Sequence, residues 1–373
     1  MERYPNLTRY ERDSLGRAFN LADGHARQTQ DDAQDEIRRR LPALFRTSEF
    51  GRQPDIEHDF QAAFFDLAGQ TSAVERPDTL LCTSASLATD LVATFLSRAG
   101  YSVGLVQPCF DNLATIMERR RVAMVPLTEA WFRAPLPGKS DVDALFLVLP
   151  NNPTGFLLDR AGFAALAERC AAGRRILILD WTFRFFSDLN GWDQYEILDA
   201  SGVSYLCIED TGKTWPTLDL KCSILAASTD LYPELLKVHN DVLLNVSPFV
   251  LRLLREYILD SRRRGLDASV RHPVVVNRAR LGAALTGTGL VPVPGDAAVS
   301  VEWVRIDSPH LSSGDVVDLC AGIGVGILPG DFFYWAEPGL GRRHVRFALA
   351  RDPRMFAQVC QRIEVMLRGS AVP

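Results

Sequence analysis

The sequence has no long hydrophobic run, no excess of positive charge and no CxxC motif. A membrane-spanning helix needs roughly 18 or more apolar residues in a row, so no membrane span is expected. The formal net charge of −5 gives no basic surface for nucleic acid. The first residues, MERYPNLTRYERDS, lack the apolar core of a secretion signal. These absences predict a cytoplasmic protein without a nucleic-acid or membrane partner.

Cysteine is present, but its spacing indicates no site. The seven cysteines are scattered, and most of them lie inside apolar runs. Disulfide frameworks and zinc sites use characteristic spacings that this sequence lacks. The cysteines are therefore expected to be reduced core residues, and no metal site is expected.

Apolar runs that alternate with helical patterns fill the middle of the 373-residue chain. Runs rich in Val, Ile and Leu predict buried strands, and their alternation with helices predicts a mostly parallel α/β sheet. Helices are expected over 158–173 and 247–265. The seven expected strands are 80–84, 103–107, 122–127, 144–150, 175–180, 203–210 and 222–228.

The carboxyl-terminal part has the pattern of a smaller α+β domain. Strands are expected at 297–306 and 344–350, followed by a closing helix at 352–369. The amino-terminal part is polar and helix-prone, with the loop NLADGHARQTQ inside it. The length allows one large domain and a smaller one. The expected parts are an amino-terminal segment that also joins the small domain (1–45), a large domain (46–265) and a small domain (266–373).

Short polar motifs follow several of the expected strands. They read CTSAS, PCFDN, PNNPTG, ILDWTF and EDTGKTWPTLDLK in chain order. Each has an ordinary explanation when taken alone, because serines cap helices, Asn-Pro-Thr-Gly forms turns and charged residues at strand ends are usually solvated. Open α/β sheets, however, bind ligands at the carboxyl ends of their strands.

Together and in this order, the motifs resemble those of fold-type I, aminotransferase-like enzymes that use pyridoxal 5′-phosphate. An arginine in the late strand HVRFALA completes the set, and the resemblance extends over nearly the whole chain. It implies a large domain with a mostly parallel seven-stranded sheet, a smaller α+β domain and a homodimer. It also implies an enzyme that acts on an amino acid.

The resemblance implies catalytic roles for two residues and a phosphate site. Lys213 is expected to carry the cofactor as a Schiff base and to act as the general base. Asp180 is expected to pair with the protonated pyridine nitrogen, which makes the ring an electron sink. Ser86 and the amides of its helix start are expected to hold the phosphate.

Three further positions complete the implied pocket. Phe110 is expected to stack on the cofactor ring, and Asn152 to donate to the ring oxygen. Arg346 is expected to clamp the substrate α-carboxylate with two parallel hydrogen bonds.

Two positions depart from the family pattern. Lys221 stands where the family usually has an arginine on the cofactor phosphate, and it offers a point charge instead of a bidentate fork. Phe183 stands where many aminotransferases have a tyrosine that contacts the ring oxygen. Simple transamination is therefore less strongly implied than cofactor binding.

The amino-terminal segment NLTRYERDSLGRAFNLADGHARQ is similar to a smaller branch of the family, which oxidises L-arginine with O2 in antibiotic pathways such as L-enduracididine biosynthesis. In that branch the segment folds over the active site, and its functional residues match Thr8, Glu11 and His25, the last as a catalytic residue. A guanidinium group favours planar carboxylate partners. Glu11, Asp23 and Asp210 are the expected carboxylates.

The resemblance implies O2 as co-substrate and release of ammonia with 4-hydroxy-2-oxoarginine, 2-oxoarginine or both, without a metal or flavin. Three alternatives remain open. The protein could be an ordinary aminotransferase for a basic amino acid, an oxidase that stops at a dehydroarginine, or a binding protein that keeps the fold without catalysis. Spacing alone indicates only a pyridoxal-phosphate enzyme for an α-amino acid.

Overall fold

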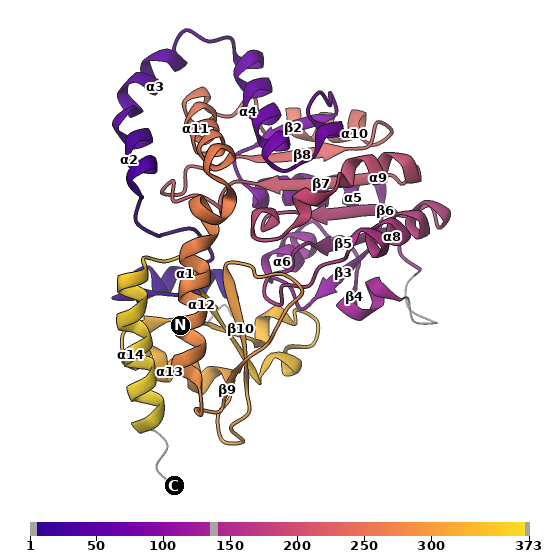
Figure 1. Ribbon diagram of the computed structural model, residues 1–373. Coiled ribbons are helices and arrows are strands. Elements are labelled where there is room, and N and C mark those ends of the chain that lie inside the picture. The colour runs from indigo at the N-terminus through magenta and orange to yellow at the C-terminus, as the bar shows by residue number, and fades with distance from the viewer. Residues whose placement is uncertain (1–5, 135–140, 370–373) are drawn as a thin grey trace.

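The computed structural model describes residues 6–134 and 141–369. These residues form a large part around a seven-stranded sheet and a smaller part around a four-stranded sheet, joined by a long helical connection (Figure 1). The amino-terminal segment runs along both parts, with α1 (Leu7–Ser14) beside the small sheet. Helices α2 (Asp32–Arg39) and α3 (Leu41–Ser48) lie beside α11 (Pro248–Arg264).

The large sheet has the strand order β2-β8-β7-β6-β5-β3-β4. Only β8 runs antiparallel to its neighbours, so the predicted mostly parallel sheet is confirmed. All seven strands lie within two residues of their predicted bounds. They are β2 (Thr79–Cys82), β3 (Val103–Gln107), β4 (Met124–Thr128), β5 (Ala144–Val148), β6 (Ile176–Asp180), β7 (Tyr205–Asp210) and β8 (Ser223–Ala227).

The central strands are buried at every position, because helices cover both faces of the sheet. Ser84 caps α5 by accepting a hydrogen bond from the Leu87 N–H, and Gly100 ends the helix in the left-handed conformation. Asp159 caps α8 in the same way. The helices are α4 (Gln53–Leu67), α5 (Ala85–Ala99), α6 (Asn112–Arg119), α7 (Glu129–Arg133), α8 (Arg160–Ala172), α9 (Gln194–Ser201) and α10 (Tyr232–Asn240).

The long connection begins with α11 (Pro248–Arg264), which confirms the helix expected over 247–265. A π-helical turn (Asp267–Arg271) joins it to α12 (His272–Leu285). The small sheet has the order β12-β13-β10-β9 and is antiparallel. Its elements are β9 (Leu290–Pro292), β10 (Val301–Ile306), α13 (Ser313–Gly322), β12 (Leu328–Pro329), β13 (His344–Ala348) and α14 (Pro353–Gly369).

The strand expected over 297–306 begins only at Val301. The residues before it bond elsewhere, since the N–H of Ala297 donates to the carbonyl of Gly155 in the PNNPTG loop at 2.9 Å. The apolar pattern predicted the strand correctly but did not indicate that its first residues support another loop.

The amino-terminal segment consists of α1 (Leu7–Ser14), β1 (Phe19–Asn20), α2 (Asp32–Arg39) and α3 (Leu41–Ser48). Strand β1 pairs in parallel with β11 (Val325–Gly326). A single bridge between Arg27 and Arg351 continues this attachment. The segment is thus fixed to the smaller part of the protein at two places, by a two-stranded sheet of its own and by an isolated bridge after β13.

All seven cysteines are free and buried, as their positions in apolar runs predicted. Within the described residues, no helix combines the length and the apolar character that a membrane crossing requires.

Helix α1 is held at its start by a buried carboxylate from the large part of the protein. The N–H of Leu7 donates to Oδ2 of Asp111 at 2.8 Å, and Oδ1 of Asp111 is buried without a partner. Burial raises the pKa of Asp111 from 3.8 to about 7, with Glu11 adding to the rise and the Leu7 N–H opposing it. The contact joins the loop after β3 to the amino-terminal helix.

Folding should therefore become less favourable as pH rises from about 4 to 7, because folded Asp111 retains a proton that the unfolded chain releases. Such a group lowers the free energy of unfolding by about 1.4 kcal/mol for each pH unit in that window. Asp111→Asn removes this ionisation, so the free energy of unfolding of the variant relative to wild type should rise by at least about 1 kcal/mol between pH 5 and 8. Urea denaturation at both pH values measures it. Equal pH dependence in both proteins would contradict the assignment.

Candidate active site

One cavity of about 230 Å³ lies at the carboxyl ends of β5, β6 and β7, beside the start of α5. Helix α1 and the loop after β1 contribute to its opposite side, and β13 contributes one arginine. Eleven of the twelve predicted site residues line this cavity, and Asp23 does not. The eleven are Thr8, Glu11, His25, Ser86, Phe110, Asn152, Asp180, Asp210, Lys213, Lys221 and Arg346.

Lys213 reaches the cavity from the tight turn that follows β7. The N–H of Gly212 donates to Oδ2 of Asp210 at 2.9 Å. A Cβ at position 212 would lie 2.9 Å from both that oxygen and the Lys221 side chain, so a larger residue here would displace one of these two cavity side chains. Burial lowers the pKa of Lys213, and nearby Lys221 lowers it further, while Glu11, Asp23 and Asp210 oppose the shift. The lowered pKa shifts the balance toward the neutral amine, which is the nucleophilic and basic form.

Two buried carboxyl groups face the cavity from the ends of β6 and β7. Burial raises the pKa of Asp180 and of Asp210 to about 6. Oδ1 of Asp180 accepts the N–H of Thr182 at 2.8 Å, whereas Oδ1 of Asp210 is buried without a partner. Buried polar atoms are normally hydrogen-bonded, so this oxygen indicates a missing donor. Asp180 could hold a protonated ring nitrogen.

The start of α5 offers backbone N–H groups and a serine to an anion. Ser86 is exposed and lines the cavity, where its Oγ accepts a long hydrogen bond from Nδ2 of Asn112 at 3.4 Å. The helix dipole favours negative charge at this end. Phe110 and Lys213, whose pKa is lowered, line the same cavity. An anion site, an aromatic ring and an amine with a lowered pKa together fit pyridoxal phosphate.

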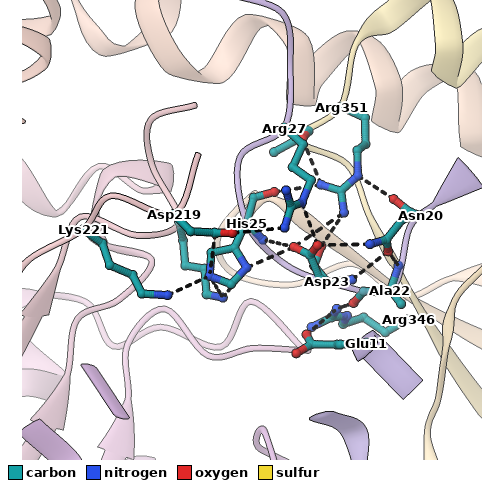
Figure 2. A network of polar contacts seen from close by, with 12 residues as sticks. Glu11, Asn20, Ala22, Asp23, His25, Arg27, Asp219, Lys221, Arg346 and Arg351 are labelled. Atoms are coloured by element: carbon teal, nitrogen blue, oxygen red, sulfur yellow. Dashed lines mark hydrogen bonds and ion pairs between the residues drawn. The ribbon is translucent and has the colours of Figure 1, made fainter. Parts of the chain in front are cut away.

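His25 lies close to the amines of two lysines, of which Figure 2 labels Lys221. Its Nε2 is 3.3 Å from Nζ of Lys213 and 3.4 Å from Nζ of Lys221. Its Nδ1 is 3.1 Å from Oδ1 of Asp23. Burial lowers the pKa of His25, and Lys213 and Lys221 lower it further against the opposing effect of Asp23. A neutral ring that donates from Nδ1 to Asp23 would direct the Nε2 lone pair toward the amines.

Asp23 has other partners than a ligand in the cavity. It accepts hydrogen bonds from Nε of Arg27 at 2.7 Å, from Nδ2 of Asn20 at 3.1 Å and from the N–H of His25 at 2.8 Å. Burial raises its pKa, but the hydrogen bond from His25 and the charges of Arg351 and Arg27 outweigh this and hold the pKa well below the usual range. Both oxygens of the Asp23 carboxylate therefore have partners within the amino-terminal segment. The sequence predicted a substrate guanidinium as the partner and did not indicate these contacts.

Arg346 is fully buried and faces three acceptors. Nη1 donates to Oδ1 of Asn152 at 3.4 Å. Nη2 donates to the carbonyl of Ala22 and lies 3.8 Å from Oε1 of Glu11 (Figure 2). Its Nε is buried without a partner. Burial lowers the pKa of Arg346 to about 10, so the group is charged at neutral pH. One free donor beside a charged fork suits a carboxylate.

Burial also raises the pKa of Glu11, although Lys213 and Arg346 oppose the rise. Phe183 lines the cavity and brings no hydroxyl group to it.

Sequence reasoning missed Thr182 and Asn112 as lining residues. Each stands two residues after a predicted site residue in a quoted motif, so motif position alone could have identified them.

Comparison with known proteins places these features in a family. The model of aminotransferase class I and II matches residues 18–212, a little more than half of the chain. A solved structure of MppP, soaked with the product 2-ketoarginine, is 35% identical, covers 94% of this chain and 99% of that one, and superimposes with a TM-score of 0.89.

More distant structures share the fold. Aspartate aminotransferase from Thermus thermophilus, solved with maleate, has a TM-score of 0.77 at 15% identity and covers 97% of this chain and 96% of its own. Among curated relatives, histidinol-phosphate aminotransferase from Geobacter sulfurreducens is 32% identical over 106 residues. That stretch is 28% of this chain and spans only 29% of the relative's length.

Proposed function

Because this chain belongs to the aminotransferase class I and II family and has its fold-type I architecture, we propose that it is a pyridoxal-phosphate enzyme that oxidises L-arginine with O2. The products are 4-hydroxy-2-oxoarginine, 2-oxoarginine or both, with ammonia, and the enzyme works as a homodimer in specialised metabolism. The likeness to MppP over nearly the full length, in a chain whose own amino-terminal segment lines the cavity, carries this proposal.

The cofactor is held by residues that come from three strand ends and one helix start. Lys213 forms the covalent link, and Asp180 keeps the proton on the ring nitrogen. Ser86 and the α5 amides bind the phosphate together with Lys221, while Phe110 stacks on the ring and Asn152 contacts the ring oxygen. When bound, pyridoxal phosphate supplies an electron-withdrawing ring that stabilises negative charge at the substrate Cα.

The substrate is held at both ends by opposite charges. Arg346 binds the α-carboxylate, for which its fork and free Nε are suited. Glu11 on α1 and Asp210 at the end of β7 bind the guanidinium group, and Thr8 adds a hydroxyl one turn before Glu11 on α1. The unpartnered oxygen of Asp210 supports this orientation, because a guanidinium donor would satisfy it.

Two groups move protons. Lys213, once free of its covalent link, removes the Cα proton as the general base, and its lowered pKa favours the neutral form that this step requires. Nε2 of His25 lies 3.3 Å from the Lys213 amine, and the pKa of His25 is also lowered, which favours the neutral ring. It exchanges protons with this amine or with the water that adds to the substrate.

With O2 reduced to hydrogen peroxide, electron balance fixes the stoichiometry. Oxidation of arginine to 2-oxoarginine and ammonia consumes one water and reduces one O2 to hydrogen peroxide. The 4-hydroxy product requires a second two-electron oxidation of the carbon chain, followed by addition of water at C4, so it consumes a second O2. The new hydroxyl oxygen thus comes from water.

The three alternative functions can be distinguished from the proposed one by their products. An ordinary aminotransferase for a basic amino acid needs an oxo-acid acceptor and ignores O2. An arginine oxidase that stops at a dehydroarginine adds no water, and a non-catalytic binding protein yields no product. Phe183, in place of the usual tyrosine, weighs against ordinary transamination.

Mass analysis of the products tests the proposal. Purified enzyme with L-arginine as the sole amino acid, under air and in heavy-oxygen water, should give 2-oxo acids without any added acceptor. A C4 hydroxyl that carries the heavy label would support hydroxylation. Unchanged arginine, or turnover only after an oxo acid is added, would refute the oxidase assignment.

Glu11→Gln should raise the KM for arginine roughly 10- to 100-fold, since it removes one charge-assisted hydrogen bond worth about 1.5–3 kcal/mol. Steady-state kinetics measures the change. Asp13→Asn on the exposed side of α1 is the matched control and should behave as wild type. Cofactor affinity should be equal in all three proteins. An unchanged KM in the Glu11 variant would remove Glu11 from the substrate site.

A further inference from the structure

Arg351 is a buried arginine outside the cavity, and its guanidinium gathers carbonyl groups from the amino-terminal segment (Figure 2). Nε donates to the carbonyl of Asn20 at 2.6 Å, Nη1 to that of His25 at 2.8 Å, and Nη2 to that of Asp23. Nη1 also donates to the carbonyl of Ala350 at 3.0 Å. Burial lowers the pKa of Arg351 to about 10, so it is charged at neutral pH.

The base of this arginine is itself fixed. Nδ2 of Asn277, in the middle of α12, donates to the carbonyls of Leu349 and Arg351 at 2.8 and 2.9 Å. The N–H of Arg27 donates to the carbonyl of Ala350 at 2.9 Å. The guanidinium therefore extends from a rigid junction between β13 and α14 and reaches across to the segment that carries His25.

The segment from Leu21 to Ala26 has no helix or strand of its own. The carbonyls of Leu21 and Ala22 accept from the Ala348 N–H and from Arg346, whereas those of Asp23 and His25 accept from Arg351. Loss of this donor would cost free energy for each carbonyl that stays buried. A planar guanidinium can bind several carbonyls in one fixed arrangement, whereas a lysine ammonium cannot fix their mutual geometry as well. Arg351 thus defines the path of the backbone on both sides of Asp23.

The consequence reaches the cavity through Asp23 and His25. With the backbone fixed, the Asp23 carboxylate accepts from the N–H and lies 3.1 Å from Nδ1 of His25. Nε2 then lies 3.3 Å from the Lys213 amine. The second ring nitrogen of a catalytic histidine is commonly set by a carboxylate in this way.

We propose that Arg351 is a positioning residue, which binds three backbone carbonyls of the amino-terminal segment and thereby holds the Asp23–His25 pair with Nε2 toward Lys213. Arg351 touches neither the cavity nor the reacting atoms. The proposal rests on the proposed function only in assigning proton transfer to His25; the placement itself is independent of the reaction.

The test compares the holoenzyme with the variants Arg351→Met, Arg351→Lys and Arg354→Met. Arg354 is exposed on the following helix, so its variant is a control for loss of one positive charge. Amide hydrogen exchange by mass spectrometry reports on peptides that cover residues 19–27. Exchange of the histidine C2 proton against pH reports the pKa of His25 individually. Steady-state kinetics with arginine reports kcat and KM separately.

In Arg351→Met, we expect about tenfold or faster amide exchange in 19–27 with unchanged exchange in the large sheet. The pKa of His25 should rise toward its ordinary value as the segment opens to water. Because misplacement by about 1 Å can cost about 100-fold in rate, kcat should fall by about that factor with KM altered less than threefold. Arg351→Lys should lie between Met and wild type, and Arg354→Met should match wild type.

Wild-type exchange and an unshifted His25 titration in Arg351→Met would overturn the proposal. So would a variant with faster exchange but wild-type kcat and product ratio. If Arg351→Met does not fold, Arg351→Lys decides by the same measures. If wild-type enzyme proves not to oxidise arginine, the proposed function fails, but both exchange measurements need no substrate and still decide the placement.

Discussion

Lys213→Ala should abolish turnover, with kcat reduced by at least about 10⁴-fold. Lys213 has two tasks in the account, since it holds the cofactor covalently and removes the Cα proton. Loss of a general base alone typically costs about 10²–10⁴-fold, and loss of the covalent nucleophile adds to that. Its position in the cavity, with a pKa lowered by burial and Lys221, suits both tasks.

Borohydride reduction provides the direct check. Wild-type holoenzyme should lose its colour and carry the cofactor mass on the peptide with Lys213, while Lys213→Ala should carry none. Lys237→Ala is the matched control, because Lys237 lies exposed on α10, away from the cavity, and pairs with the exposed Glu234. Substantial arginine turnover by Lys213→Ala, or cofactor label on another lysine, would contradict the assignment.

Asp180→Asn should lower kcat by roughly 10²–10³-fold, the cost typical of removing one preorganised electrostatic contact to charge that develops in a transition state. The carboxylate keeps the ring nitrogen protonated, and an amide cannot balance that charge. Asp180 is buried at the end of β6, where burial raises its pKa to about 6. A cationic ring nitrogen at hydrogen-bond distance would favour the ionised carboxylate.

The Asp180 variant should still bind the cofactor, because Lys213 and the phosphate site are intact. Its absorption spectrum should change, and the rate of Cα proton exchange with solvent should fall with kcat. Asp188→Asn, whose side chain is fully exposed on the loop after β6, is the control. Wild-type kcat in Asp180→Asn would show that ring protonation does not depend on this residue.

The large sheet could be predicted from the sequence because local signals determine it. Continuous apolar runs mark strands that are buried on both faces, and polar motifs mark where each strand ends. The carboxyl ends of parallel strands meet at one edge. Asn152, Asp180 and Lys213 therefore converge in the cavity as their motif positions predicted.

The contribution of the amino-terminal segment could not be predicted from local patterns. Helix α1 depends on Asp111, which lies 104 residues away, and the His25 carbonyl depends on Arg351, 326 residues away. Both contacts bind backbone atoms, so they leave no characteristic spacing in the sequence. Only the resemblance to arginine oxidases indicated that Glu11 and His25 enter the site.

Asp23 illustrates a second reason why the contacts of the amino-terminal segment could not be predicted from the sequence. Residue type indicated a carboxylate suited to a guanidinium group, and the structure does pair it with guanidinium, but from Arg27 within the same segment. Bonds from Asn20 and His25 complete its set. Residue chemistry favoured a guanidinium partner, and the local fold of the segment supplies one from Arg27, while the predicted contact with a substrate stays a prediction.

Oxygen uptake is the most direct test of the proposed oxidation of L-arginine by O2. Purified holoenzyme with L-arginine and no oxo acid should consume O2 in an electrode chamber and form hydrogen peroxide, and Lys213→Ala should consume none. Between one and two molecules of O2 should disappear for each ammonia released, according to the ratio of 2-oxoarginine to its 4-hydroxy form. Absence of O2 uptake by active holoenzyme, with amino transfer to an added oxo acid instead, would contradict the account.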